Sequence, residues 1–184
     1  MRKMQKSDIS IIAVLAFTLV SDRLSKWAVA AGMELGESFP VIPHILNFTY
    51  VHNRGASFGI LADKRWVYML LSAVALVVMT AVLVKYRRRH MLLSVSLSMI
   101  IGGGLGNMID RLFVTDAAGN NVVIDFLEFD FVSFAVFNLA DTFITVGAVL
   151  LAVYVLFFES KVEKRLAHSA SADTEGDGDD KNGG

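Results

Sequence analysis

Two aspartates, Asp125 and Asp141, are the residues whose type and position in this chain best suit catalysis. Each lies at the edge of an apolar stretch, and an Asp at the centre of a bilayer costs about 2.5–3.5 kcal/mol on insertion scales. Chains keep such residues where they face protein or water and act on something. Two carboxylates brought close together cannot both ionise easily, so the pair supplies one acid and one base at neutral pH. This pattern predicts the chemistry of an aspartic peptidase.

Other chemistries have weaker support. The chain has no cysteine, which excludes thiolate metal sites, a cysteine nucleophile and disulfides. The four histidines have neither the HExxH spacing of zinc peptidases nor the spacing of a catalytic triad. The glycines at 102–106 fall inside an apolar stretch with no preceding strand, which disfavours nucleotide chemistry. We therefore expect no metal, no organic cofactor and no nucleic-acid partner.

Further polar residues accompany the two aspartates. Asp22 and Lys26 are four residues apart, a spacing that permits an ion pair on one helix face. An equally plausible arrangement has Lys26 reaching to the membrane interface while Asp22 caps a neighbouring group. Asp110 beside Arg111 is more readily explained as a buried structural pair than as a catalyst, because the adjacent cation holds the carboxylate ionised.

Helical spacing places the polar groups at one depth. Asn107 and Asp110 are three residues apart, and so are Asn138 and Asp141, so each pair shares a helix face near the same boundary of the hydrocarbon. Polar groups gathered at one depth of the membrane cost free energy if they serve only to pack the helices. Their convergence suits a catalytic cleft or a polar permeation path.

The elements that must position these residues are four apolar stretches in a chain of 184 residues that is 54% hydrophobic and 19% charged. Each is near or above the length of about 20 residues that crosses a bilayer. They predict an all-α integral membrane protein with four transmembrane helices, at 9–31, 66–84, 91–109 and 134–158. Residues 1–166 are expected to form one membrane domain, and residues 167–184 a disordered acidic cytoplasmic tail.

Basic residues orient this bundle. They concentrate before the first stretch, between the second and third, and after the fourth, so both termini are expected on the cytoplasmic side. The first stretch is interpreted as a retained helix, because charged residues and not a small-residue cleavage site follow its apolar run. The two aspartates then lie near the outer leaflet.

A small extracytoplasmic cap containing β-structure is expected between the helices. Leu46, Phe48 and Tyr50 alternate with other residues in the manner of a strand, and the segment 122–124 is a possible partner. Gly102 and Gly106 have the spacing that lets two helices approach closely in lipid, so they are assigned to packing.

The motifs resemble those of the bacterial lipoprotein signal peptidase family, signal peptidase II. Five blocks agree in order, and the agreement extends from about residue 8 to residue 158. The blocks are Asp22 with Lys26, Asn53-Arg54-Gly55-Ala56-Ser57-Phe58, Gly102-Gly103-Gly104-Leu105-Gly106-Asn107-Met108-Ile109-Asp110-Arg111, Val123-Ile124-Asp125-Phe126, and Phe137-Asn138-Leu139-Ala140-Asp141. Ser57 replaces the usual Ala, a small-for-small exchange.

The resemblance implies an inner-membrane aspartyl endopeptidase that cleaves the signal peptide of a prolipoprotein just before its diacylglyceryl-modified cysteine. It assigns the catalytic pair to Asp125 and Asp141. Its supporting and substrate-binding positions correspond here to Asp22, Lys26, Asn53, Gly55, Asn107, Asp110, Arg111, Asn138 and Ala140. The implied partners are lipid-modified precursors and membrane lipids, and we expect a monomer.

Three alternative functions fit part of this pattern. A small proton-coupled transporter would use intramembrane Asp residues as a relay, but it predicts titratable groups spread across the bilayer, and the long uncharged run 142–158 gives no path onward. A presenilin-like protease would need a Gly-x-Gly-Asp motif, which neither aspartate has. A non-enzymatic assembly factor would tolerate Asp125→Asn.

Overall fold

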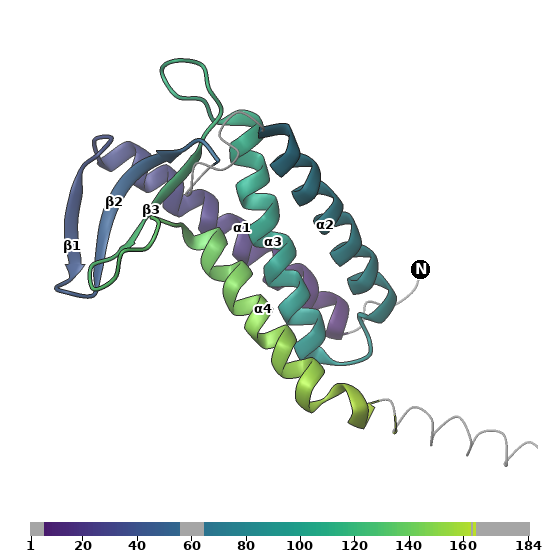
Figure 1. Ribbon diagram of the computed structural model, residues 1–184. Coiled ribbons are helices and arrows are strands. Elements are labelled where there is room, and N and C mark those ends of the chain that lie inside the picture. Colours follow the sequence, from purple (N-terminus) through teal and green to yellow (C-terminus); the bar gives the residue numbers. More distant parts are fainter. Residues whose placement is uncertain (1–5, 56–64, 163, 165–184) are drawn as a thin grey trace, which may run out of the picture.

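The computed structural model describes residues 6–55, 65–162 and 164. Within them, helices form a bundle, and a sheet lies at one end of it (Figure 1). The helices are α1 (Lys6–Gly32), α2 (Arg65–Tyr86), α3 (Met91–Phe113) and α4 (Leu139–Phe157). The strands are β1 (Ser38–Ile42), β2 (Leu46–Asn53) and β3 (Val123–Phe129). The expected motif residues 56–58 and the tail 167–184 lie outside the described residues.

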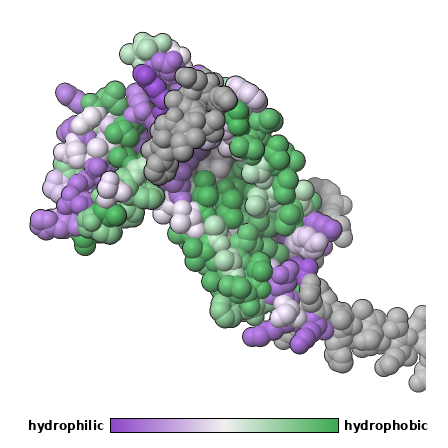
Figure 2. All heavy atoms as spheres, in the orientation of Figure 1, coloured by the Kyte–Doolittle hydropathy of each residue, from purple (hydrophilic) through white to green (hydrophobic). Residues whose placement is uncertain are grey.

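Among the described helices, α2, α3 and α4 are long and apolar enough to cross a membrane. Helix α1 has 27 residues, enough for about 40 Å of helix. Its second half carries Asp22, Arg23 and Lys26. The space-filling view shows a hydrophobic belt over the helices, with polar residues at the sheet end and at the opposite end (Figure 2).

The prediction for the start of the last helix was wrong. Helix α4 begins at Leu139 and not at residue 134. The backbone of Phe137 pairs with β3: its N–H donates to Leu127 O at 2.9 Å, and its carbonyl accepts from the N–H groups of Phe126 and Leu127. A residue whose backbone groups pair with a strand is unavailable to a helix. Helix α3 also runs to Phe113, past the expected end at 109.

The sheet is antiparallel with the order β1-β2-β3. The expected strand at 46–51 and its partner at 122–124 are both present, and they extend to Asn53 and Phe129. Strand β1 was not predicted, because it contains Pro40. Proline is tolerated there since β1 is an edge strand and needs fewer backbone donors.

An apolar cluster fixes the sheet on the C-terminal part of α1. It consists of buried Val29 from α1, Tyr50 from β2, and Ile124 and Phe126 from β3. Phe48 packs on its edge, with its ring 5.6 Å from that of Phe126. Because β3 is anchored in this way, the residue between Ile124 and Phe126, which is Asp125, is held on the opposite face of the strand.

Helix α3 packs against each of the other helices, and glycines let it do so. The sequence assigned Gly102 and Gly106 to close packing, and the structure agrees. A Cβ on Gly102 would lie 2.9 Å from Thr18 of α1, and one on Gly106 would lie 2.5 Å from the Asp22 carboxylate. The closest approach belongs to Gly103, where a Cβ would lie 2.4 Å from the carbonyl oxygen of Ala140.

We expect Gly103→Ala to destabilise the protein by about 1–3 kcal/mol, the usual cost of overpacking. The backbone of α4 must shift to admit the methyl group. Gly104→Ala is the matched control, because its Cβ would meet only the end of the flexible Leu76 side chain, at 2.8 Å. Both changes gain the same helix propensity. Thermal unfolding in detergent measures the difference, and equal melting temperatures would refute the clash.

Candidate active site

Asp125 lies on β3 and is 2% exposed. Two amides hold its carboxyl group. Asn53 Nδ2 at the end of β2 donates to Asp125 Oδ2 at 2.8 Å, and Asn138 Nδ2 donates to Asp125 Oδ1 at 2.6 Å. The N–H of Gly55 donates to Asn53 Oδ1 at 2.8 Å, and Gly55 has a φ of +107°, which favours glycine. The turn at Asn53–Gly55 therefore orients the amide that contacts Asp125.

Asp141 lies in the first turn of α4 and takes part in the cap of that helix. Asn138 is the N-cap residue: its Oδ1 accepts from the Asp141 N–H at 3.0 Å, and Asp141 Oδ2 accepts from the Asn138 N–H at 3.2 Å. This reciprocal arrangement is a capping box. Asn107 Nδ2 of α3 donates to Asp141 Oδ1 at 2.7 Å. The carboxylate is thus fixed from two helices.

Asn138 contacts both carboxyl groups, Asp125 through its side-chain amide and Asp141 through its backbone N–H. The same side-chain amide donates to Asn107 Oδ1 at 2.9 Å. Asn138 is fully buried, so these contacts are shielded from solvent. The structure therefore brings together Asp125, Asp141 and the three asparagines that the sequence singled out.

A cluster of four charged residues lies beneath this site, where α1 meets α3. The Lys26 ammonium lies 3.0 Å from Asp22 and 2.7 Å from Asp110, and the Arg23 guanidinium lies 3.1 Å from Asp22 and 2.6 Å from Asp110. Both carboxylates are fully buried, and Lys26 is 2% exposed. Two acids and two bases balance, which is the condition under which charges are tolerated away from water.

The charge cluster corrects one expectation, the pairing of Asp110 with Arg111, and decides between the two arrangements considered for Lys26. Asp110 pairs with Arg23 and Lys26 of α1, and in the described part of the chain its neighbour Arg111 forms no ion pair with it. Lys26 points into the protein and not toward the interface. The expected Asp22–Lys26 pair is present, and Asp22 also accepts the Ala140 N–H at the start of α4, at 3.1 Å.

The charge cluster is joined to the aspartate pair by short polar contacts. Lys26 Nζ donates to Asn107 Oδ1 at 2.9 Å, and Asn107 Nδ2 in turn donates to Asp141. Ala140, fully buried, connects Asp22 to the first turn of α4 through its N–H. Arg23 was not among the candidate site residues predicted from the sequence. Its pairing with both Asp22 and Asp110 is set by the contact between α1 and α3.

Burial and the charge of Asp141 affect the protonation of Asp125. Burial, and to a smaller extent the negative charge of Asp141, raises the pKa of Asp125 from its usual 3.8 to about 7, against the hydrogen bonds from Asn53 and Asn138. At neutral pH, Asp125 therefore keeps its proton in a large fraction of molecules. A protonated carboxyl beside a second carboxyl is the arrangement that acid–base hydrolysis requires.

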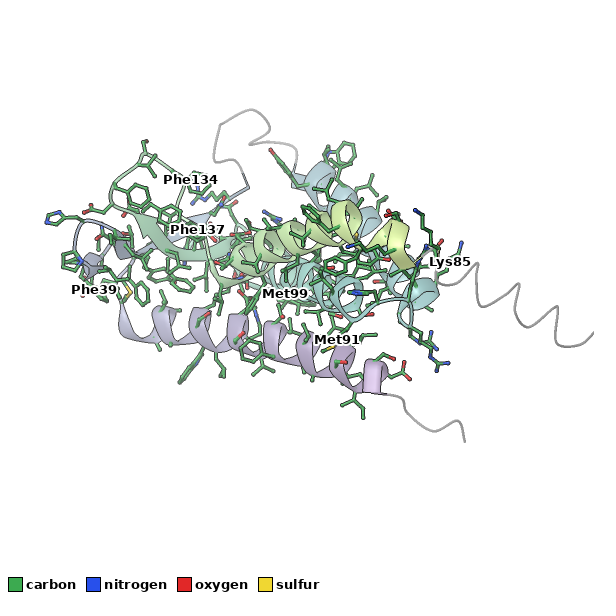
Figure 3. All side chains as sticks on the ribbon, turned by 90° about the horizontal axis from the view of Figure 1, so that it is seen from below. Phe39, Lys85, Met91, Met99, Phe134 and Phe137 are labelled. Atoms are coloured by element: carbon green, nitrogen blue, oxygen red, sulfur yellow. The ribbon has the colours of Figure 1, made fainter. Side chains whose placement is uncertain are left out.

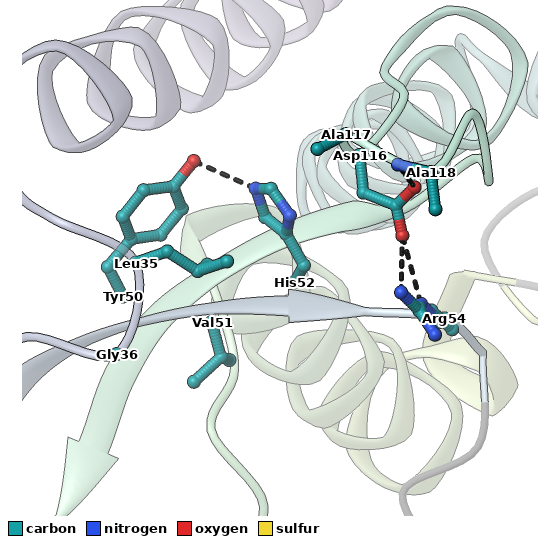
Figure 4. Close-up of a pocket in the computed structure, with 9 residues that line it drawn as sticks. All are labelled: Leu35, Gly36, Tyr50, Val51, His52, Arg54, Asp116, Ala117 and Ala118. Carbon is teal, nitrogen blue, oxygen red and sulfur yellow. Dashed lines mark hydrogen bonds and ion pairs between the residues drawn. The ribbon is translucent and has the colours of Figure 1, made fainter.

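A hollow of about 720 Å³ lies on the sheet near this site, between the end of α1 and the loop after α3 (Figure 4). Tyr50 OH and His52 Nε2 lie 2.9 Å apart in it. At its edge, Arg54 binds Asp116 Oδ2 through two nitrogens, at 3.0 and 2.6 Å. The Asn120 N–H and the Arg54 guanidinium lower the pKa of Asp116 to about 2, so this pair stays charged. Neither residue of the aspartate pair lines the hollow.

Within the described ranges, no group of three or more His, Cys, Asp or Glu side chains is placed to hold a metal ion. The site itself offers two carboxyl groups and the amides around them. Together they can activate a water molecule and protonate a leaving group.

Comparison with known proteins identifies a matching protein family and a similar protein of known function. A family model described as signal peptidase (SPase) II matches residues 14–157. A lipoprotein signal peptidase of Bacillus velezensis is 34% identical over 154 residues, which are 83% of this chain and 97% of that protein.

Two solved structures are also similar, both described as bacterial membrane enzymes determined by the in meso method. The one at 2.3 Å resolution is 31% identical, with a TM-score of 0.71 over 80% of this chain and 87% of that chain. The one at 1.9 Å resolution is 30% identical, with a TM-score of 0.72 over 81% of this chain and 94% of that chain.

Proposed function

The chain belongs to the signal peptidase II family, and from this membership we propose that it cleaves prolipoprotein signal peptides with Asp125 and Asp141 as its catalytic pair. Removal of the signal peptide from lipid-modified prolipoproteins, just before the diacylglyceryl cysteine, is the function of this enzyme. The observation that carries the catalytic assignment is the contact of one buried residue, Asn138, with both carboxyl groups.

The proposed mechanism uses one protonated and one ionised carboxyl group. Asp125, with its raised pKa, holds the proton and donates a hydrogen bond to the scissile carbonyl oxygen. Asp141 carries the negative charge and takes a proton from a water molecule, whose oxygen attacks the carbonyl carbon. The tetrahedral diol collapses as a proton passes to the leaving amine. No metal or organic cofactor enters these steps.

The supporting residues fall into two groups in this proposal. Asn53, Asn107 and Asn138 fix the two carboxyl groups and limit their rotation. The charge cluster fixes α1 against α3 and, through Asp22 and the Ala140 N–H, against the start of α4. Arg111 is outside the charge cluster and is proposed to contact the substrate.

We place the enzyme in the bacterial inner membrane with four spanning helices, α1 among them, both termini in the cytoplasm and one domain over residues 1–166. The charges of α1 are compatible with a span because they are paired inside the protein. The sheet then lies on the outer side, and the catalytic pair is near the outer leaflet. There, the acyl chains of a lipidated cysteine remain in hydrocarbon while its scissile bond reaches the headgroup boundary.

The transporter alternative is not favoured. The family and the curated relative support peptide cleavage, and the titratable groups with contacts in the site gather at the sheet end of the helices. A relay would need them across the full depth of the membrane.

The first test is a cleavage assay with the full chain in detergent. We expect cleavage of a diacylglyceryl-modified precursor, no cleavage of the same precursor without the lipid, and no change of rate in EDTA. The products, separated by size and identified by mass, give the cleavage position. Loss of activity in EDTA that a divalent cation restores would contradict the aspartic mechanism.

The rate should fall as the pH rises through about 7. Above the pKa of Asp125, that residue loses the proton that the proposed mechanism requires, so kcat/KM is expected to drop about tenfold per pH unit. The same raised pKa means that the folded protein binds a proton more tightly than the unfolded chain, so this residue's contribution to stability decreases between about pH 4 and 7. The check is kcat/KM measured from pH 5 to 9.

Asn53→Ala provides a control for this pH profile. The hydrogen bond from Asn53 lowers the Asp125 pKa, so its removal should shift the descending limb to higher pH as well as reduce the rate. If the descending limb of the pH profile does not move in this variant, the limb reports the titration of a group other than Asp125.

A further inference from the structure

A second groove lies between α2 and α3, away from the catalytic pair. It has a volume of about 630 Å³, and it is lined by Leu76, Val77, Thr80, Ala81, Val84, Lys85, Ile101 and Leu105. The lining is apolar except for Thr80 and, at one end, Lys85. Lys85 lies at the end of the helices opposite the sheet (Figure 3).

Helix α2 is the most apolar of the candidate spans, and only 6% of its apolar window is buried inside the protein. Its contact with α3 is close at Gly104, which faces Leu76. Beyond this point, the exposed Val77, Ala81 and Val84 leave the groove open. In a bilayer, an open apolar groove on a spanning helix is filled by hydrocarbon and not by water.

The charge at the groove's end indicates which lipid fills it. Arg87 and Arg88, which follow Lys85, are both paired with Asp8, at 3.1 and 3.6 Å. The Lys85 ammonium lies 5.1 Å from the centre of the Tyr86 ring and forms no ion pair with a carboxylate in the described part of the chain. It is an exposed cation, and in the orientation proposed above it lies at the boundary where lipid phosphates lie.

We propose that this groove binds one anionic phospholipid, with an acyl chain along α2 and α3 and the headgroup phosphate on Lys85. An apolar groove with a single cation at its end is complementary to an anionic lipid, which has an apolar acyl chain and a negatively charged headgroup. In the orientation proposed above, this lipid belongs to the cytoplasmic leaflet. The site is separate from the catalytic pair, so the binding does not depend on the cleavage mechanism.

The test is native mass spectrometry of the full chain in detergent, titrated with dioleoylphosphatidylglycerol or dioleoylphosphatidylcholine. We expect one tightly bound phosphatidylglycerol. Lys85→Gln should weaken it about fivefold, the effect of one cation near a lipid surface, and leave phosphatidylcholine unaffected. Ala81→Phe fills the groove and should abolish tight binding of phosphatidylglycerol with Lys85 intact. Glycerol phosphate without acyl chains should not bind.

Lys161→Gln is the matched control, because Lys161 is an exposed lysine after α4 and does not line the groove. Cleavage activity in detergent should be unchanged in Lys85→Gln and Ala81→Phe, which shows that both variants fold. Equal loss in Lys85→Gln and Lys161→Gln would overturn the site, as would tight binding that survives Ala81→Phe. A dimer that Ala81→Phe dissociates would also overturn it, by assigning the groove to a second copy of the chain.

Discussion

Replacing either Asp125 or Asp141 with Asn is expected to reduce precursor cleavage by about 100- to 10,000-fold, the contribution of a general acid or base. Asn keeps the shape of the side chain and a carbonyl oxygen that accepts hydrogen bonds. It cannot take a proton from water or hold the shared proton. Each carboxyl group accepts from two donors, one on each oxygen, so the Asn side chain keeps one of these contacts and loses the other, together with the acid–base function.

The matched control is Asp130→Asn, on the same side of the molecule. Asp130 is partly exposed, with 39% of its side chain accessible, and accepts from Asn47 at 3.2 Å. We expect wild-type turnover from this variant. Circular dichroism and the melting temperature establish that all three variants fold. Turnover within a fewfold of wild type in Asp125→Asn or Asp141→Asn would remove that residue from the mechanism.

The candidate site could be predicted because hydrocarbon makes unpaired charge costly. Asp125 and Asp141 stand out in an apolar sequence for that reason, and helical spacing was enough to connect Asn138 with Asp141. The sequence alone does not predict which helices and strands contact each other. Asn53 and Asp125 are 72 positions apart and meet only because β2 and β3 pair.

The partner of Asp110 shows the same limit. Arg111 is adjacent in the sequence, but the partners in the structure come from α1, 84 and 87 positions away. Which face of α1 meets α3 depends on where glycines allow the helices to approach, and this is a tertiary property. Arg23 was missed for this reason.

Helix boundaries failed where a helix meets the sheet. Residues 134–137 are apolar and continue the pattern of α4, so hydropathy extended the helix over them. Their aromatic rings instead pack beside β3, with the rings of Phe129 and Phe137 5.0 Å apart. Hydropathy measures burial from water and does not separate burial in lipid from burial against a sheet.

Lys26→Met is expected to cost about 3–5 kcal/mol of stability, because it leaves two buried carboxylates with one cation. Asp22 and Asp110 are both fully buried, and Arg23, their remaining partner, is 30% exposed. The change also removes the donor that Lys26 provides to Asn107, which positions Asp141. Both the melting temperature and kcat should therefore fall, whereas loss of packing alone would lower only the melting temperature.

The double variant Lys26→Met with Asp110→Asn separates the two roles of Lys26. It again balances the cluster, with Asp22 against Arg23, so the melting temperature should recover most of the loss. The rate should stay low, because Asn107 still lacks its contact with Lys26. A double variant less stable than Lys26→Met would show that charge balance is not what the cluster provides. Recovery of both stability and kcat would show that Lys26 contributes only to stability. The contacts from Lys26 through Asn107 to Asp141 would then have no part in catalysis.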